Sequence, residues 1–193
     1  FSEGLVYKFV PIKVEKGRNP NALGEINKEQ TYQNLMEVFH WGNMDKEGTL
    51  VDYYTRRLTN NYRVQFSVLA DAYADEYEAE QRKVEIMKQI QSQGMAADTV
   101  LRTPVGDINP STIDADIKKA EAAMADAQEH INNLLNRSFE VMPHENVPFG
   151  KVIPSYISAH YVAGNEEKAQ QYTDQMFELF KEEMDYYLDV DPK

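Results

Sequence analysis

The chain has 193 residues, of which 42% are hydrophobic and 27% charged, a composition typical of a folded protein rather than a disordered one. Thirty-two acidic residues against 20 basic ones give a net charge of −12, which argues against nucleic acid or an anionic lipid surface as a partner. The absence of cysteine excludes disulfides and thiolate metal sites. No apolar run approaches the roughly 20 residues that a membrane-spanning helix needs, so no span is expected in this segment.

Residues 1–26 are predicted to form an extended arm followed by a loop. The stretch from Leu5 to Val14 is rich in β-branched and aromatic residues, and Pro11 disfavours a helix there. Residues 15–27 mix Lys, Gly, Asn and Pro without a period, as loops do. Because the sequence starts at Phe1, without an initiator Met or a signal segment, we expect it to be part of a longer protein.

Residues 27–193 are predicted to form one all-α domain built from helical hairpins. Its first helix is expected to start at Asn27, a good N-cap with Gln30 three residues later. Apolar residues follow at helical spacing, and Gly42 ends the pattern. This helix is therefore short and amphipathic.

A long second helix is predicted from Thr49, a second capping residue, to about Gln93. A bend is expected near Asn60 and Asn61. Its apolar positions recur every three or four residues, at Tyr54, Leu58, Tyr62, Phe66, Leu69, Tyr73 and Tyr77.

Residues 79–130 are predicted to form an antiparallel helical hairpin that projects from the main body. The connection at residues 94–110 holds two glycines and two prolines, so it is expected to be a long loop. The apolar residues that follow alternate steps of four and three, which is typical of a narrow seam packed on one neighbouring helix. The seam consists of Ile113, Ile117, Ala120, Met124, Ala127 and Ile131.

A final pair of helices is predicted at the C-terminal end. Its first helix opens at Pro148 or Pro154 and ends at Gly164, and Asn165 caps the second. The second helix has an apolar stripe made of Ala169, Tyr172, Met176, Phe180, Met184 and Tyr187. Most of the 12 tyrosines lie on such helix stripes, so core packing is expected for them.

Three segments resemble parts of tetratricopeptide repeats, in a degenerate form. AHYVAGNEEKA, at residues 159–169, is similar to the centre of a repeat, where a Gly turn separates two helices. LADAYADEY, at residues 69–77, resembles a first helix, and FEVMPHENVPF, at residues 139–149, resembles the Pro-terminated end of a second. Two repeats are fewer than the three or so that stabilise such an array, so helices at 27–40 and 49–60 are expected to cap it.

The order of several segments suggests a more specific resemblance. SEGLVYKFVPIK, TYQNLMEVFHWGNMD, NNYRVQFSVLADAY, ENVPFG, AHYVAG and EEMDYYLDV follow one another along the chain. Together they resemble the C-terminal region of a bacterial multi-pass membrane family likened to protein O-mannosyltransferases. The resemblance implies that the catalytic carboxylates lie in membrane-embedded loops absent from this sequence. It also implies a module tethered to the cytoplasmic membrane on its extracytoplasmic, periplasmic side.

No metal site, cofactor or catalytic residue is expected from the residues themselves. The histidines His40, His130, His144 and His160 fall on different predicted elements, without the spacing of a helical metal pair. Acidic clusters are interpreted as solvated helix faces, because acid–base catalysis needs paired carboxylates in different environments. No Gly-rich phosphate loop or nucleophile elbow is present.

We therefore expect a non-catalytic helical-repeat module that binds a protein or peptide partner. Paired helices would expose a concave face whose first-helix positions are Asp71, Asp75, Ser158 and Tyr161.

Two alternatives stay open at this point. In the first the segment is architectural, packing on its own membrane domain through Leu5 to Val14 and on another protomer through the Ile113–Ile131 seam, which would make a homo-oligomer. In the second, less favoured, it binds or processes a glycan, which requires a perturbed carboxylate pair for which the sequence offers no strong candidate.

Overall fold

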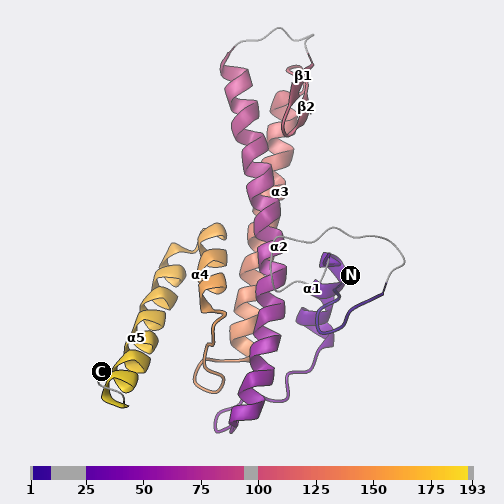
Figure 1. The fold of residues 1–193 in the computed structure, drawn as a ribbon. Helices are drawn as coiled ribbons and strands as arrows, with labels where there is room; N and C mark the ends of the chain where they lie inside the picture. Colours follow the sequence, from indigo (N-terminus) through magenta and orange to yellow (C-terminus); the bar gives the residue numbers. More distant parts are fainter. Residues whose placement is uncertain (1, 10–24, 94–99, 191–193) are drawn as a thin grey trace.

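The computed structural model describes residues 2–9, 25–93 and 100–190, and its fold is all-α, as predicted (Figure 1). Two long helices form a central column, the other helices lie beside its lower half, and a small two-stranded ribbon lies at its upper end. The helices are α1 (Lys28–Gln33), a π-helical turn η1 (Asn34–Val38), α2 (Tyr53–Ser92), α3 (Ile113–Val141), α4 (Ile153–Val162) and α5 (Glu166–Val190). A small ribbon is formed by β1 (Leu101–Thr103) and β2 (Gly106–Ile108).

Helix α2 begins at Tyr53, and its N-cap Asp52 lies three residues after the predicted cap Thr49. The Asp52 carboxylate caps it, accepting a hydrogen bond from the Thr55 N–H at 2.7 Å, whereas the Thr49 hydroxyl donates to the Asn43 carbonyl at 3.0 Å. The helix then continues for 40 residues. A separate capping helix at 49–60 is therefore wrong, because these residues belong to the start of α2, and the bend expected near Asn60 and Asn61 stays a prediction.

The projecting antiparallel hairpin is confirmed: α2 and α3 pack along their length and extend beyond the other helices (Figure 1). Two separate hydrophobic clusters hold them together. The lower one includes the fully buried Phe66, Leu69 and Leu134, and it also receives side chains from α4 and the N-terminal region. The upper one lies within the hairpin and consists mainly of Val84, Met87, Ile90, Ile108, Ile113, Ile117 and Ala120.

The α3 seam faces α2 of the same chain. Ile113, Ile117, Ala120, Ala127 and Ile131 are buried, and Met124 is half-buried. Because α2 covers these side chains within the chain, a second copy could reach them only by displacing α2, and a homo-oligomer through this seam stays a prediction.

The predicted loop at 94–110 contains an unexpected antiparallel ribbon, while residues 94–99 lie outside the described part. Leu101 pairs with Ile108 and Thr103 with Gly106, across a tight turn where Gly106 has φ of +115°. Ile108 is buried in the upper cluster. The ribbon therefore extends the hydrophobic core of the hairpin toward its tip.

The C-terminal helix pair is present as predicted. Gly164 adopts φ of +74° at the turn, and the flanking Ala159, Ala163 and Ala169 are buried where the two helices approach most closely. The side-chain amide of Gln128 donates to the Val162 carbonyl at 2.9 Å, which fixes this pair against α3.

The N-terminal segment packs against the lower half of the column. Asn27 caps α1 by accepting a hydrogen bond from the Gln30 N–H, as predicted, and Lys28 forms an ion pair with Glu76 of α2. The described start of the arm is a tight turn at Gly4, where Ser2 bridges to Tyr7 and to Ile26. The rest of the predicted arm and loop, residues 10–24, lies outside the described residues.

Candidate functional site

The four predicted groove residues lie on two helices. Asp71 and Asp75 are one turn apart on α2 and half-buried. Ser158 and Tyr161 are exposed on α4, on the side opposite its buried residues Tyr156, Ala159 and Ala163. They therefore point away from the helices that α4 packs against, and a groove formed by all four residues stays a prediction.

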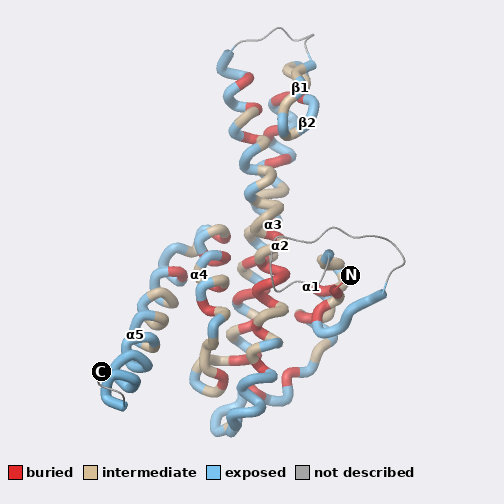
Figure 2. The backbone as a smooth tube through the Cα atoms, viewed as in Figure 1, coloured by how far each residue is buried: buried red, intermediate tan, exposed pale blue. Residues whose placement is uncertain are grey.

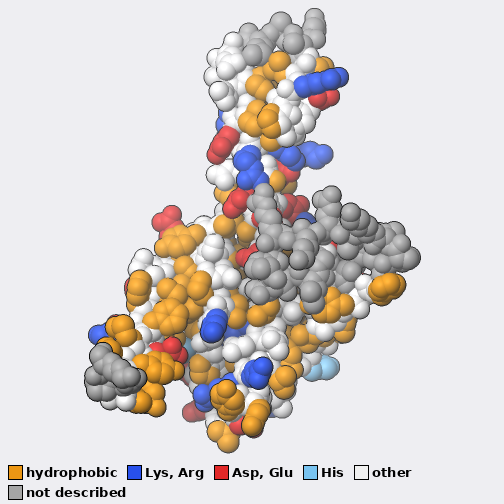
Figure 3. Space-filling model, in the orientation of Figure 1, with side chains coloured by type: hydrophobic (Ala, Val, Ile, Leu, Met, Phe, Trp, Pro, Cys, Tyr) orange, Lys and Arg blue, Asp and Glu red, His pale blue; other side chains and the backbone are white. Residues whose placement is uncertain are grey.

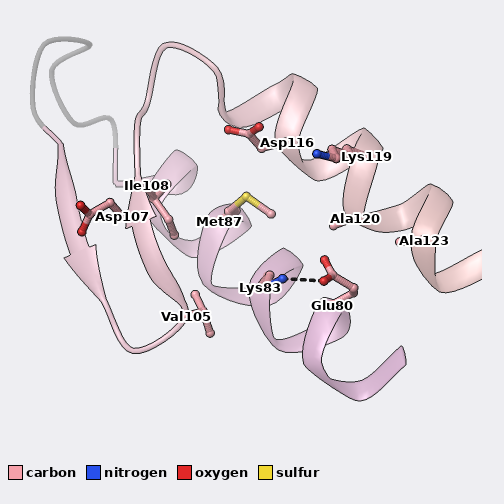
Figure 4. A pocket seen from close by; sticks show the side chains of 10 residues that line it. All are labelled: Glu80, Lys83, Met87, Val105, Asp107, Ile108, Asp116, Lys119, Ala120 and Ala123. Atoms are coloured by element: carbon pink, nitrogen blue, oxygen red, sulfur yellow. Dashed lines mark hydrogen bonds and ion pairs between the residues drawn. The ribbon is translucent and has the colours of Figure 1, made fainter. Parts of the chain in front are cut away.

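A groove of about 400 Å³ lies near the hairpin tip, between the ribbon and the two long helices (Figure 4). Its apolar lining comes from Met87, Val105, Ile108, Ala120 and Ala123. Charged side chains surround it, among them the Glu80–Lys83 ion pair and the exposed Asp107, Asp116 and Lys119. Because three acidic and two basic side chains surround a small apolar floor, the tip groove has no strong charge preference that would select a ligand.

A buried cation joins α2 to the segment between α3 and α4. Arg63 is fully buried, and its guanidinium Nη2 donates to the carbonyls of Met142 and Val147 at 2.5 and 2.6 Å. The Phe149 ring lies 4.7 Å from the guanidinium carbon. These contacts cap backbone carbonyls that would otherwise be buried without donors, which is a structural role.

Tyr156 extends this buried polar cluster. Burial raises the pKa of Tyr156 to about 12, so its hydroxyl stays protonated and donates to the Arg63 carbonyl at 3.1 Å. Ser138 lies 2.6 Å from the same hydroxyl. Every oxygen in this cluster therefore has a partner within the fold.

His160 lies buried among aromatic rings next to this cluster. Its ring stacks on Phe139 and Tyr172, and neither ring nitrogen has a hydrogen-bond partner within the described residues. Burial, with a smaller contribution from the charge of Lys168, lowers the pKa of His160 from 6.5 to about 4. The imidazole is therefore neutral near pH 7 and packs as an aromatic side chain.

Helix α5 presents an apolar surface that the rest of the described chain leaves uncovered. Its first half packs on the body: Lys168 donates to Asn136 of α3, and Tyr172 stacks on Phe139 at 4.5 Å. Its second half, residues 177–190, is exposed along its length except for Leu179 (Figure 2). We call this second half the α5 overhang.

One face of the overhang carries large apolar side chains. Phe177, Phe180, Met184 and Tyr187 are 63%, 51%, 57% and 68% exposed, and with Leu188 they form what we call the overhang stripe. Their spacing of three and four residues places them on one side of the helix. Figure 3 shows hydrophobic side chains gathered over this part of the molecule.

The α5 overhang carries mostly negative charge. Glu183 lines a shallow groove together with Phe180, Met184, Tyr187 and Leu188. Over residues 177–190 there are five acidic side chains, Glu178, Glu182, Glu183, Asp185 and Asp189, against the single basic Lys181. Helical spacing places Glu183 on one edge of the stripe and Lys181 on the other, so a group that covers the stripe meets Glu183 on one side and a net charge of −4 over the whole overhang.

Sequence reasoning found the residues of this surface but not their exposure. The predicted stripe of the last helix included Phe180, Met184 and Tyr187 together with the buried Ala169, and the same spacing was interpreted as core packing. That expectation is right for Tyr73 and Tyr156 and wrong for Tyr187. The available signal was length, because the predicted stripe runs for more turns than the preceding helix can cover.

No group of three or more His, Asp or Glu side chains that could hold a metal ion occurs within residues 2–9, 25–93 and 100–190. Over the same residues, no helix combines the length and the apolar character needed to cross a membrane. No protein-family model, curated protein or solved structure matches the chain.

Proposed function

We propose that this chain is a non-catalytic interaction module that docks a helix of a partner protein on the overhang stripe. The observation that carries the proposal is the exposure of five large apolar side chains on one continuous helix face. Isolated exposed apolar residues are ordinary, but a contiguous patch bordered by polar groups marks a contact surface. A helix face with this spacing is best covered by another helix.

The proposal includes the wider setting that the family resemblance implies. The module would be appended to a membrane-embedded, glycosyltransferase-like protein and tethered at the extracytoplasmic face of the cytoplasmic membrane. Its acidic surface supports a protein partner over an anionic lipid one, because the net charge of −12 repels anionic headgroups.

A crosslinking pull-down with matched variants tests the function. The double variant Phe180→Ser, Met184→Ser removes two exposed apolar side chains, so it should change the free energy of unfolding by no more than about 0.5 kcal/mol per site. We expect the double variant to capture at least tenfold less partner than the parent protein, since interface anchors of this size contribute about 1–2 kcal/mol or more each.

The control is a variant in which a short turn replaces residues 81–122. The lower hydrophobic cluster lies outside this segment, so the body should stay folded. It should also keep the partner. If the double variant keeps the partner and the variant lacking residues 81–122 loses it, the partner binds the tip groove and not the overhang stripe.

The architectural role is the second candidate, and one observation favours it. Val6, Tyr7 and Phe9 of the N-terminal arm are exposed apolar residues outside the α5 surface. They could pack on the membrane domain of the same protein. Substituting Phe9 with Ser would then release that domain without affecting partner capture by the overhang.

A further inference from the structure

The overhang exists because α5 is much longer than the helix beside it. Helix α5 has 25 residues and α4 has 10, so about 15 residues of α5, roughly 22 Å at 1.5 Å per residue, continue past the start of α4. The turn at Gly164 joins the two helices closely, which places Ile153 opposite the middle of α5. The overhang therefore lacks the neighbouring helix that the first half of α5 has.

The stripe does not change character where α4 ends. Ala169, Tyr172 and Met176 are buried or half-buried on the body, and Phe180, Met184 and Tyr187 continue the same face at the same spacing. An amphipathic face that continues in register favours a further helix packed as α4 is packed, rather than a small ligand or an extended peptide.

The charge of the overhang indicates which charges the partner helix should carry. Glu183 lies beside the stripe, and the overhang carries five acidic residues and one lysine. A second copy of the chain would bring an overhang of the same net negative charge against this one, and like charges across an interface are unfavourable. A lysine or arginine side chain flanking an apolar stripe would instead pair with Glu183, and the net negative charge of the overhang would speed its approach through long-range attraction.

We propose that the overhang stripe binds a cationic amphipathic helix of a partner protein, with apolar residues at i, i+3, i+4 and i+7 flanked by Lys or Arg. This inference rests on the proposed function and adds the chemical class of the partner. Glu183 supplies the charge selectivity, and Phe180 with Met184 supplies the apolar anchor.

The test uses the full chain and two synthetic helical peptides of about 20 residues. Both peptides carry the same Leu stripe, and their flanking positions are Lys in one and Glu in the other. Fluorescence anisotropy measures each affinity at low and high salt. We expect the Lys peptide to bind at least about tenfold more tightly, with an advantage that shrinks as salt rises.

Two single variants separate local charge from net charge. Glu183→Lys should weaken binding of the Lys peptide about fivefold, because it reverses the charge next to the stripe. Glu182→Lys makes the same change in net charge one residue away, on the opposite side of the helix, and should have less than a twofold effect. Equal effects of the two variants would overturn the assignment to Glu183.

The remaining outcomes distinguish this inference from the function on which it rests. If both peptides bind equally and Phe180→Ser, Met184→Ser abolishes both, the stripe is a docking surface but the cationic partner is wrong. If the double variant binds the Lys peptide as the parent does, the docking function itself is wrong for this surface. Concentration-dependent dimerisation that the double variant removes would identify a second copy as the occupant and overturn the inference.

Discussion

Replacing Arg63 by alanine is expected to lower the free energy of unfolding by about 3 kcal/mol, the largest single-site loss that the structure indicates for a polar residue. The variant leaves the carbonyls of Met142 and Val147 without their buried donor and opens a cavity beneath Phe149. Urea unfolding followed by circular dichroism measures the change.

Two further variants show whether the carbonyl contacts are responsible. Arg63→Met keeps much of the apolar volume and removes the charge. Its free energy of unfolding should be about 2 kcal/mol below that of the parent if the unpaired carbonyls cause most of the destabilisation. Arg57→Ala, at an exposed position on the same helix, should change stability by less than about 0.5 kcal/mol. A more stable Arg63→Met variant would show that the desolvation cost of the buried cation exceeds its hydrogen bonding.

Acid is expected to destabilise the protein through His160. Burial lowers the pKa of His160 in the folded state to about 4, against an ordinary value of 6.5. Between these two pH values the unfolded chain binds a proton that the folded chain excludes, so stability falls as the pH drops from 6.5 toward 4. Each unit of pKa shift corresponds to about 1.4 kcal/mol, which gives a loss of roughly 3 kcal/mol over the window.

His160→Phe should remove this part of the acid dependence. The phenyl ring can pack beside Phe139 and Tyr172 as the imidazole does, and it cannot take up a proton. Unfolding free energies of variant and parent, compared across the window, isolate the contribution of His160 from that of the carboxylates. A difference between the two proteins that stays constant with pH would contradict the assignment, whereas the exposed His40→Phe should follow the parent.

The hairpin could be predicted because its signal is local and periodic. The α3 seam repeats in steps of four and three, and that spacing specifies one neighbouring helix. The cap of α2 was predicted at Thr49, whereas the structure has it at Asp52. Both residue types cap helices well, and the choice depends on which oxygen reaches the free N–H groups, here the Asp52 carboxylate.

The ribbon at the hairpin tip could not be predicted in the same way. Each strand has three residues, too few to show alternation, and Pro104 and Gly106 indicate a loop as readily as a tight turn. Its stability depends on Ile108 reaching the upper hydrophobic cluster. That contact is a tertiary one, made between segments separated along the chain.

The exposure of the overhang stripe was missed for a related reason. Spacing identifies which side chains of α5 share a face, but burial depends on whether another helix is present along the whole of that face. Another helix covers the face at Ala169, which is buried, whereas Met184 on the same face is exposed. The same limit applies to Tyr53 and Tyr54, which begin α2 and lie exposed below the core.

The central claim, that the overhang stripe is a docking surface, is tested most directly by site-specific photo-crosslinking in cells. A photoreactive amino acid replaces Phe180 in one version of the protein and Glu182, on the opposite side of the same helix turn, in the other. The account predicts a crosslinked adduct with a discrete partner polypeptide from position 180 and none from position 182. Equal adducts from both positions, or no adduct from position 180, would contradict it.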